Sequence, residues 1–322
     1  LNRCSLMKNI LIVAAGAVGG YFGGLLSKND DVVFIARGEH LQATKTRGLL
    51  IKSQNSGTFT AKGVFASEVP ENYIADLILY CVKEYHNESA AELISPAIGC
   101  NTTIMTLQNG IGSADFLSKK FSAANIVIGA AYVEATKANP GVIEEHGGDC
   151  LIKFGPYEAS KKSNTSINKI HHLLTTAKIQ NEIVKNINSV IWEKLIFISA
   201  LSGMTCITRS EFSEVISNSS TKDMTWRLIN ESYKIAQASG VNLSKDIPDL
   251  IMKNFLQNKN ELVSSMHSDL KNGRPIEIKA INGAISNIAK SLNIQAPINE
   301  TIYNALEIYN QNTRNSLEEN RR

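Results

Sequence analysis

The chain has 322 residues, 43% of them hydrophobic and 20% charged, and its formal net charge at pH 7 is +3. This length suits two domains with ordinary cores. The small net charge, without a basic stripe among aromatics, gives no support to nucleic-acid binding. The histidines show no H-x-x-x-H spacing, so we predict no metal site. Five widely spaced cysteines form no C-x-x-C pair and predict free thiols in a reducing cytoplasm.

The N-terminal residues and the apolar stretches predict neither secretion nor membrane insertion. Residues 1–6 contain Arg3 but no apolar core of a signal peptide. Met7 resembles a natural start, which would make residues 1–6 an upstream extension. The longest uncharged apolar stretch, residues 195–208, is too short to span a bilayer. We therefore expect a cytoplasmic protein without a membrane partner.

The first motif is a glycine-rich turn between a predicted strand at 10–13 and a predicted helix at 18–26. Its sequence is Ala14-Ala15-Gly16-Ala17-Val18-Gly19-Gly20. Backbone N–H groups and the dipole at such a helix start bind a pyrophosphate. Ala14 stands where the G-x-G-x-x-G fingerprint has its first glycine, and a turn that only packs a helix on a strand remains an alternative. If this position needs a positive φ, alanine costs about 1 kcal/mol there.

A second predicted strand, at 31–36, ends in Arg37 and Gly38. An NAD-binding protein carries an acidic residue near this point, where it holds the ribose hydroxyl. The cation of Arg37 instead suits the 2′-phosphate of NADP. A solvated surface arginine is the alternative interpretation.

The rest of the first half alternates between strand and helix patterns. A helix at 40–47 precedes a small hairpin of 48–52 with 59–65, and another helix covers 88–97. Buried strands are predicted at 75–82, 102–107, 125–133, 141–146 and 151–154. Apolar strands separated by helices predict a parallel sheet covered on both faces, with ligands at the carboxyl ends of its strands. Four candidate residues lie at such ends: Gly16, Arg37, Lys83 and Asn109.

From about residue 188 onward the pattern is helical. Helices are predicted at 190–201, 223–239, 248–255, 278–292 and 297–310. With the boundary near 183–188, we divide the chain into an α/β domain at 7–185 and an all-α domain at 186–322. A cleft between two such domains is a usual place for a substrate.

Two charged residues of the second half are candidates for chemistry. Lys194 shares one helical face with Ile198 and Ser202, and burial beside an apolar helix would lower its pKa and suit a general acid. A lysine that only extends its charge to solvent at a helix edge is the alternative. Glu277 lies between isoleucines at a predicted helix start, where it is either a partner of the helix dipole or a site residue.

Taken together, these segments resemble the 2-dehydropantoate 2-reductases, or ketopantoate reductases, over residues 7–308. The resemblance rests on Gly16-Ala17-Val18-Gly19-Gly20-Tyr21, Ala36-Arg37-Gly38, Val82-Lys83, Gln108-Asn109-Gly110, Trp192-Glu193-Lys194-Leu195, Ser264-Ser265-Met266 with Asp269, and Glu277 with Ile281-Asn282-Gly283. It implies an N-terminal Rossmann-type α/β domain and an all-α C-terminal domain. It further implies NADPH-dependent reduction of 2-dehydropantoate to (R)-pantoate, in pantothenate and coenzyme A biosynthesis, by a monomer or homodimer.

The resemblance also implies residue roles. Lys194 would protonate the developing alkoxide, and Glu277 would orient the site beside it, while Asn109 would bridge cofactor and substrate. The implied cofactor-binding residues are Ala15, Gly16, Ala17, Val18, Gly19, Arg37, Lys83, Asn109, Ala135 and Glu277. The implied residues for a small 2-oxo acid substrate are Asn109, Lys194, Ile198, Ser202 and Ser265.

The sequence departs from the family on the helical face that follows Lys194. Members of the family usually carry asparagines where this chain has Ile198 and Ser202. Isoleucine cannot form a hydrogen bond, and losing one to a charged group costs about 1.5–3 kcal/mol. Two alternatives follow, a reductase of a more apolar 2-oxo acid and a non-catalytic NADP sensor that uses the domain cleft as a switch.

Overall fold

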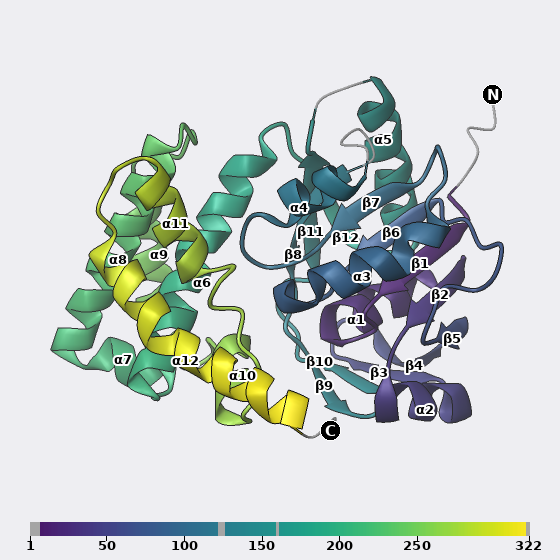
Figure 1. Ribbon diagram of the computed structural model, residues 1–322, viewed down its shortest axis with the longest axis horizontal. Coiled ribbons are helices and arrows are strands. Elements are labelled where there is room, and N and C mark those ends of the chain that lie inside the picture. Colours follow the sequence, from purple (N-terminus) through teal and green to yellow (C-terminus); the bar gives the residue numbers. More distant parts are fainter. Residues whose placement is uncertain (1–6, 122–125, 159–160, 320–322) are drawn as a thin grey trace. The chain divides into compact units, whose positions relative to one another are not determined.

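The computed structural model describes residues 7–121, 126–158 and 161–319 and divides the chain into two compact units (Figure 1). Unit 1 comprises Leu1–Gln108 and Ser113–Ile187, and unit 2 comprises Asn109–Gly112 and Asn188–Arg322. The chain thus leaves unit 1 for four residues directly after Gln108 and then returns.

Unit 1 is built on an eight-stranded sheet with the order β12-β11-β8-β7-β6-β1-β2-β5. Its strands are β1 (Asn9–Val13), β2 (Asp31–Ile35), β5 (Val64–Ala66), β6 (Leu77–Tyr80), β7 (Thr103–Thr106), β8 (Ile126–Tyr132), β11 (Leu151–Pro156) and β12 (Gln180–Ile183). The six strands from β8 to β5 are parallel to one another, which confirms the predicted parallel core. The wholly parallel sheet that we predicted is wrong at one place, because β11 runs antiparallel to β8.

A second sheet explains this reversal. Its order is β4-β3-β10-β9, with β3 (Leu49–Ser53), β4 (Gly57–Ala61), β9 (Ala135–Asn139) and β10 (Val142–Glu145). The chain passes from β8 through β9 and β10 before it reaches β11, and no crossover helix lies on this path, so β11 pairs antiparallel with β8. The strand predicted at 141–146 is thus β10, Val142–Glu145, and it belongs to the second sheet and not to the main one.

The predicted hairpin at 48–65 is only partly correct. Strands β3 and β4 pair antiparallel, as expected. Phe65, however, lies in β5, which pairs parallel with β2 in the main sheet. The chain changes sheet at Gly63, which has φ +142°, and a Cβ there would collide with the carbonyl oxygen of Val32.

The main sheet is covered on both faces. Along β1, Ile10 and Ile12 belong to one buried cluster, and Leu11 and Val13 belong to another. The first cluster includes residues of α1 (Ala17–Leu26) and α5 (Lys161–Thr176), and the second includes residues of α3 (Asn87–Ile94) and α4 (Ser113–Lys120). The alternation follows from the two-residue period of a strand. The remaining regular elements of unit 1 are α2 (Gly38–Arg47) and two short 3₁₀ turns, Glu84–His86 and Ser95–Ala97.

Unit 2 is helical, as expected. Its helices are α6 (Ile187–Thr208), α7 (Phe212–Ser217), α8 (Ser219–Ala238), α9 (Ile247–Gln257), α10 (Ser265–Lys271), α11 (Asn282–Ser291) and α12 (Pro297–Glu319). The sequence did not predict α7 or α10. The helix predicted from residue 278 begins only at Asn282, because residues 278–281 form a turn closed by a hydrogen bond from the Gly283 N–H to the Ile278 carbonyl at 2.9 Å. Glu277 is therefore not part of a helix.

Helix α6 is longer than the uncharged stretch that we identified. By length and composition alone, this 22-residue helix could cross a bilayer, and it is the one helix of the described residues that could. In its most apolar window, 61% of the residues are buried inside the protein. Leu195, Ile196 and Met204 lie in the hydrophobic core of unit 2, as they would in a core helix.

Candidate functional site

The glycine-rich turn connects β1 to α1 and has the backbone that the fingerprint position predicts. Ala14 has φ +73°, in the region that favours glycine. A Cβ on Gly19 would collide with the Ala14 carbonyl oxygen, so this position requires glycine. A Cβ on Gly16 would instead point into open space, since no described heavy atom other than those of its chain neighbours lies within 4 Å of it. The open space at Gly16 and the uncharged first turn of α1 leave room for an anion at the helix N-terminus.

Two cations lie near this turn in unit 1. Arg37 follows β2 and is exposed at the start of α2, and Lys83 follows β6, a parallel neighbour of β1. Burial, and next the positive charge of Arg37, lower the pKa of His86, which indicates that Arg37 lies close to the segment that begins at Lys83. The carboxyl ends of β1, β2 and β6 thus carry the open turn and two positive charges.

Gln108 holds the Lys83 segment in place, a role that the sequence did not suggest. Its buried side-chain amide donates to the Val82 carbonyl at 2.9 Å and to Asn87 Oδ1 at 2.8 Å. The Tyr80 hydroxyl donates to the Asn87 carbonyl at 3.0 Å. The only signal in the sequence was the presence of Gln108 in the Gln108-Asn109-Gly110 motif.

The second group of candidate residues lies in unit 2. The Lys194 ammonium donates to Asn109 Oδ1 at 2.9 Å, although the two residues are 85 positions apart. Burial lowers the pKa of Lys194 to about 8, and the nearby charge of Glu277 partly opposes this shift. Glu277 is itself buried, at 5% exposure. An amine with such a pKa can hold a proton near neutral pH and release it to a stronger base.

Gly110 explains how Asn109 reaches Lys194. Gly110 has φ +85°, and a Cβ there would collide with the carbonyl oxygen of Ala280. The Ile111 N–H donates to the same carbonyl at 3.4 Å. The segment Asn109–Gly112 is therefore held against the turn that follows Glu277, and this contact places Asn109 and Glu277 in one site with Lys194.

The residues expected to bind substrate differ in their surroundings. Ile198 is half-buried and packs against the core of unit 2. Ser202 is buried, and its hydroxyl accepts a hydrogen bond from Ser264 at 3.0 Å. Ser264 also caps α10 by accepting the His267 N–H at 3.1 Å, while Ser265 is exposed at the start of that helix. Ser264, for which the sequence predicts no role of its own, is thus the direct partner of Ser202.

Ala135 is the first residue of β9 in the second sheet of unit 1. It is half-buried and packs against the same core cluster as α1. Strand β9 also contacts α1 directly.

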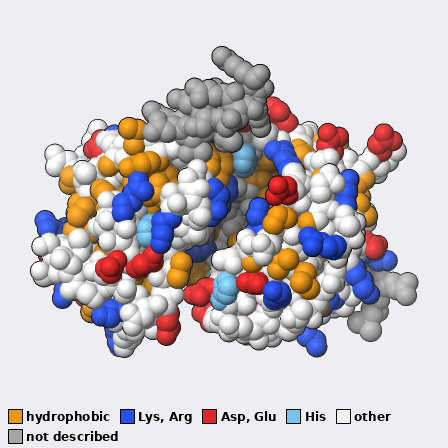
Figure 2. All heavy atoms as spheres, turned by 90° about the horizontal axis from the view of Figure 1, so that it is seen from below, with side chains coloured by type: hydrophobic (Ala, Val, Ile, Leu, Met, Phe, Trp, Pro, Cys, Tyr) orange, Lys and Arg blue, Asp and Glu red, His pale blue; other side chains and the backbone are white. Residues whose placement is uncertain are grey.

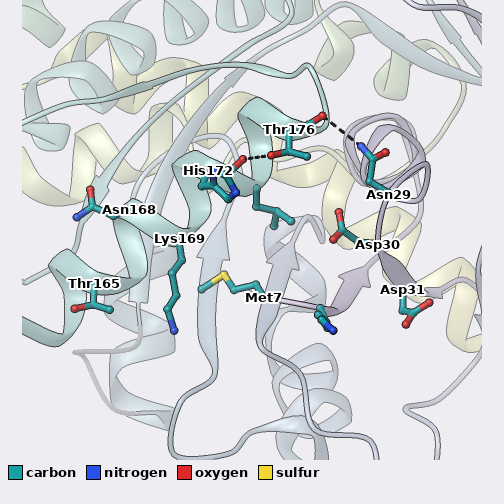
Figure 3. A pocket seen from close by; sticks show the side chains of 11 residues that line it. Met7, Asn29, Asp30, Asp31, Thr165, Asn168, Lys169, His172 and Thr176 are labelled. Carbon is teal, nitrogen blue, oxygen red and sulfur yellow. Dashed lines mark hydrogen bonds between the residues drawn. The ribbon is translucent and has the colours of Figure 1, made fainter. Parts of the chain in front are cut away.

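A cavity of about 720 Å³ lies elsewhere in unit 1 (Figure 3). Met7 precedes β1, and Asn29, Asp30 and Asp31 lie where β2 begins, so this cavity is at the amino ends of the strands. The open turn and the cations are at the opposite, carboxyl ends. None of the residues expected to bind cofactor or substrate lines this cavity.

The surface charges are mixed in sign. On the face shown in Figure 2, basic and acidic side chains are interspersed, in keeping with the small net charge.

Known proteins resemble the chain over almost its whole length. The family models "Ketopantoate reductase PanE/ApbA" and "Ketopantoate reductase PanE/ApbA C terminal" match residues 10–159 and 186–310. A 2-dehydropantoate 2-reductase of Pyrococcus abyssi is 30% identical over 303 residues, which are 92% of this chain and 96% of that protein.

Solved structures give the same result. A crystal structure of 2-dehydropantoate 2-reductase from Geobacter metallireducens is 27% identical in sequence and has a TM-score of 0.86. The match covers 93% of this chain and 99% of that protein. D-mandelate dehydrogenase, in a ternary structure with NADH and anilino(oxo)acetate, is 25% identical with a TM-score of 0.86, over 95% and 99% of the two chains. With a Rossmann-type N-terminal unit, a helical C-terminal unit and both family models matched, the chain belongs to the ketopantoate reductase family of oxidoreductases.

Proposed function

We propose that the protein reduces the keto group of a 2-oxo acid with NADPH, and that 2-dehydropantoate, giving (R)-pantoate, is the first substrate to test. The observation that carries this proposal is the contact between Lys194 and Asn109 at 2.9 Å, beside the buried Glu277. A lysine whose pKa is lowered to about 8 can both stabilise and protonate an oxygen that becomes negative.

The roles of the three residues follow from their contacts. The nicotinamide, when bound, supplies the hydride. The Lys194 ammonium donates a hydrogen bond to the substrate carbonyl oxygen and then the proton, a contribution of about 10²–10⁴-fold in rate. Glu277 keeps Lys194 protonated, since its charge raises the pKa of that lysine. Asn109 accepts from Lys194 through Oδ1, which leaves its amino group to donate to cofactor or substrate.

The residues of unit 1 fit a dinucleotide phosphate. The space at Gly16 and the backbone N–H groups of Ala17, Val18 and Gly19 would hold the pyrophosphate. Arg37, exposed after β2 where NAD-binding proteins carry an acid, supports a preference for NADPH. The D-mandelate dehydrogenase neighbour binds NADH, and titration of this protein with both NADPH and NADH tests the proposed preference.

The decisive experiment is steady-state oxidation of NADPH in the presence of 2-dehydropantoate. The proposal requires turnover that depends on both compounds. If the protein binds NADPH but turns over neither 2-dehydropantoate nor any other 2-oxo acid, it is a cofactor-binding protein without this activity.

We place the reaction in a reducing cytoplasm. The four described cysteines are free thiols, which is in keeping with this location.

A more apolar 2-oxo acid is the second candidate substrate. Ile198 offers no hydrogen bond, and the Ser202 hydroxyl already accepts one from Ser264, which occupies one of its acceptor positions. The ligand of the D-mandelate dehydrogenase neighbour, anilino(oxo)acetate, is an aromatic oxo acid derivative. Comparison of kcat/KM for 2-dehydropantoate and phenylglyoxylate, in the wild type and in Ile198→Asn, distinguishes the two. If the wild type prefers 2-dehydropantoate by orders of magnitude, the apolar alternative fails.

A further inference from the structure

The imidazole of His40 connects the glycine-rich turn to the second sheet of unit 1. His40 lies in the first turn of α2, three residues after Arg37, and is 7% exposed. Its Nε2 lies 2.8 Å from the Ala15 carbonyl oxygen, and its Nδ1 lies 3.0 Å from the Gly141 N–H. One buried ring therefore bridges two backbone groups that are far apart in the sequence.

The two partners determine the state of the ring. The Gly141 N–H can only donate, so Nδ1 must accept and carry no proton. The Ala15 carbonyl can only accept, so Nε2 must carry the proton. His40 is consequently neutral and held in one tautomer. Burial lowers its pKa, the bond to Ala15 raises it, and the charge of Lys137 on β9 lowers it further, so that the neutral form is favoured overall.

Ala15 is the residue through which the ring acts on the turn. Its N–H donates to the Ile35 carbonyl of β2 at 2.9 Å, and its carbonyl accepts from His40. It stands between Ala14, whose φ of +73° is unfavourable for alanine, and Gly16, where the open space lies. A backbone of this kind persists only when the surrounding structure holds it.

The other end of the bridge is equally well anchored. Gly141 has φ +79°, and its carbonyl accepts the Leu50 N–H of β3 at 2.9 Å. A Cβ on Gly141 would lie 3.0 Å from the Cβ of Ala43 on α2. Gly141 is thus fixed to both β3 and α2, and it gives the imidazole a rigid point of attachment.

We propose that His40 is a positioning residue, which sets the cofactor affinity of the protein by holding the Ala14–Gly16 backbone in its binding conformation through the Ala15 carbonyl. This inference rests on the proposed dinucleotide site at Gly16. Arg37 is the N-cap of α2, and His40 lies in the first turn of the same helix. The start of α2 would therefore contribute to both the pyrophosphate end and the 2′-phosphate end of the proposed site.

The test compares His40→Leu with His40→Gln. Leucine retains apolar bulk but leaves the Ala15 carbonyl and the Gly141 N–H without a partner, whereas glutamine can donate to the first and accept from the second. In fluorescence titrations without substrate, His40→Leu should weaken NADPH binding about tenfold, and His40→Gln should stay within about threefold of the wild type, tenfold corresponding to about 1.4 kcal/mol. His171→Leu, an exposed histidine on α5, is the matched control and should bind as the wild type does.

A second measurement needs no cofactor. The Gly141 amide is protected by His40, so its hydrogen exchange should accelerate in folded His40→Leu and remain slow in His40→Gln. Faster exchange with unchanged binding would overturn the proposal, because the bridge would then be structural only. Equal loss of binding in both variants would also overturn it, since packing rather than hydrogen bonding would be responsible. If the wild type itself binds neither NADPH nor NADH, the dinucleotide site fails, and the exchange result still tests the bridge.

Discussion

The two units present their candidate functional groups by different means. In unit 1 the turn between β1 and α1 presents mainly backbone groups, and its shape is set by Ala14, Gly19 and the partners of Ala15. In unit 2 the candidate groups are side chains, with Lys194 donating to Asn109 beside the buried Glu277. A backbone site tolerates a changed side chain if the conformation is kept, as Ala14 illustrates. A side-chain site is expected to change its chemistry with each substitution, so the proposed preference for a more apolar substrate depends on Ile198 and Ser202.

The largest expected effect separates the two kinds of site. Lys194→Ala removes the proton donor and should lower kcat by about 10²–10⁴-fold with little change in NADPH affinity. Lys222→Ala, an exposed lysine on α8, is the control and should keep wild-type kcat. Steady-state kinetics and a separate cofactor titration measure both quantities. Equal kcat in Lys194→Ala and the wild type would rule out the proposed role of Lys194.

A smaller effect is expected at Arg37, the side chain of unit 1 that we propose contacts the 2′-phosphate. Arg37→Ala should raise the dissociation constant for NADPH about 10–100-fold, because a charge-assisted hydrogen bond is worth about 1.5–3 kcal/mol. The dissociation constant for NADH should stay nearly unchanged. Arg47→Ala, at the other end of α2, is the control. Similar losses for both cofactors would contradict a contact with the 2′-phosphate.

The titration of Lys194 sharpens the description of the unit 2 site. Because its pKa is lowered to about 8, Lys194 is protonated below this pH and loses its proton above it. The rate of reduction should therefore fall about tenfold per pH unit above about pH 8. Glu277→Gln removes the charge that raises this pKa and should move the break in kcat/KM to lower pH. A pH-independent rate up to about pH 10 would show that Lys194 is not the acid.

The smallest effect concerns the backbone of unit 1. Ala14→Gly should stabilise the fold by about 1 kcal/mol, because glycine adopts φ +73° without the penalty that alanine incurs. Ala17→Gly, in the regular first turn of α1, should instead destabilise it by about 0.5–1 kcal/mol. Urea unfolding of both variants measures the difference. Destabilisation by Ala14→Gly would mean that Ala14 is held mainly by side-chain packing.

Local patterns predicted much of the fold. The strand, turn and helix from β1 to α1, the strand that ends before Arg37, and the helical second half all follow from periodicity over a few residues. Patterns that depend on distant partners were predicted less well. Neither the antiparallel pairing of β11 with β8 nor the place of β5 in the main sheet is visible in the sequence of the strand itself. The composition of residues 278–281 predicts a helix start at Glu277, but these residues form a turn.

The sequence by itself determined the types of residue available for chemistry, namely a glycine-rich turn, a cation after β2, and Lys194, Asn109 and Glu277. Only the tertiary structure decided which of them meet. Asn109 reaches Lys194 across 85 positions because Gly110 allows close approach to Ala280. Ser264 takes up the hydroxyl of Ser202, and His40 joins Ala15 to Gly141. Burial of Lys194, which lowers its pKa to about 8, is likewise a property of the folded chain, since desolvation depends on every element packed around the amine.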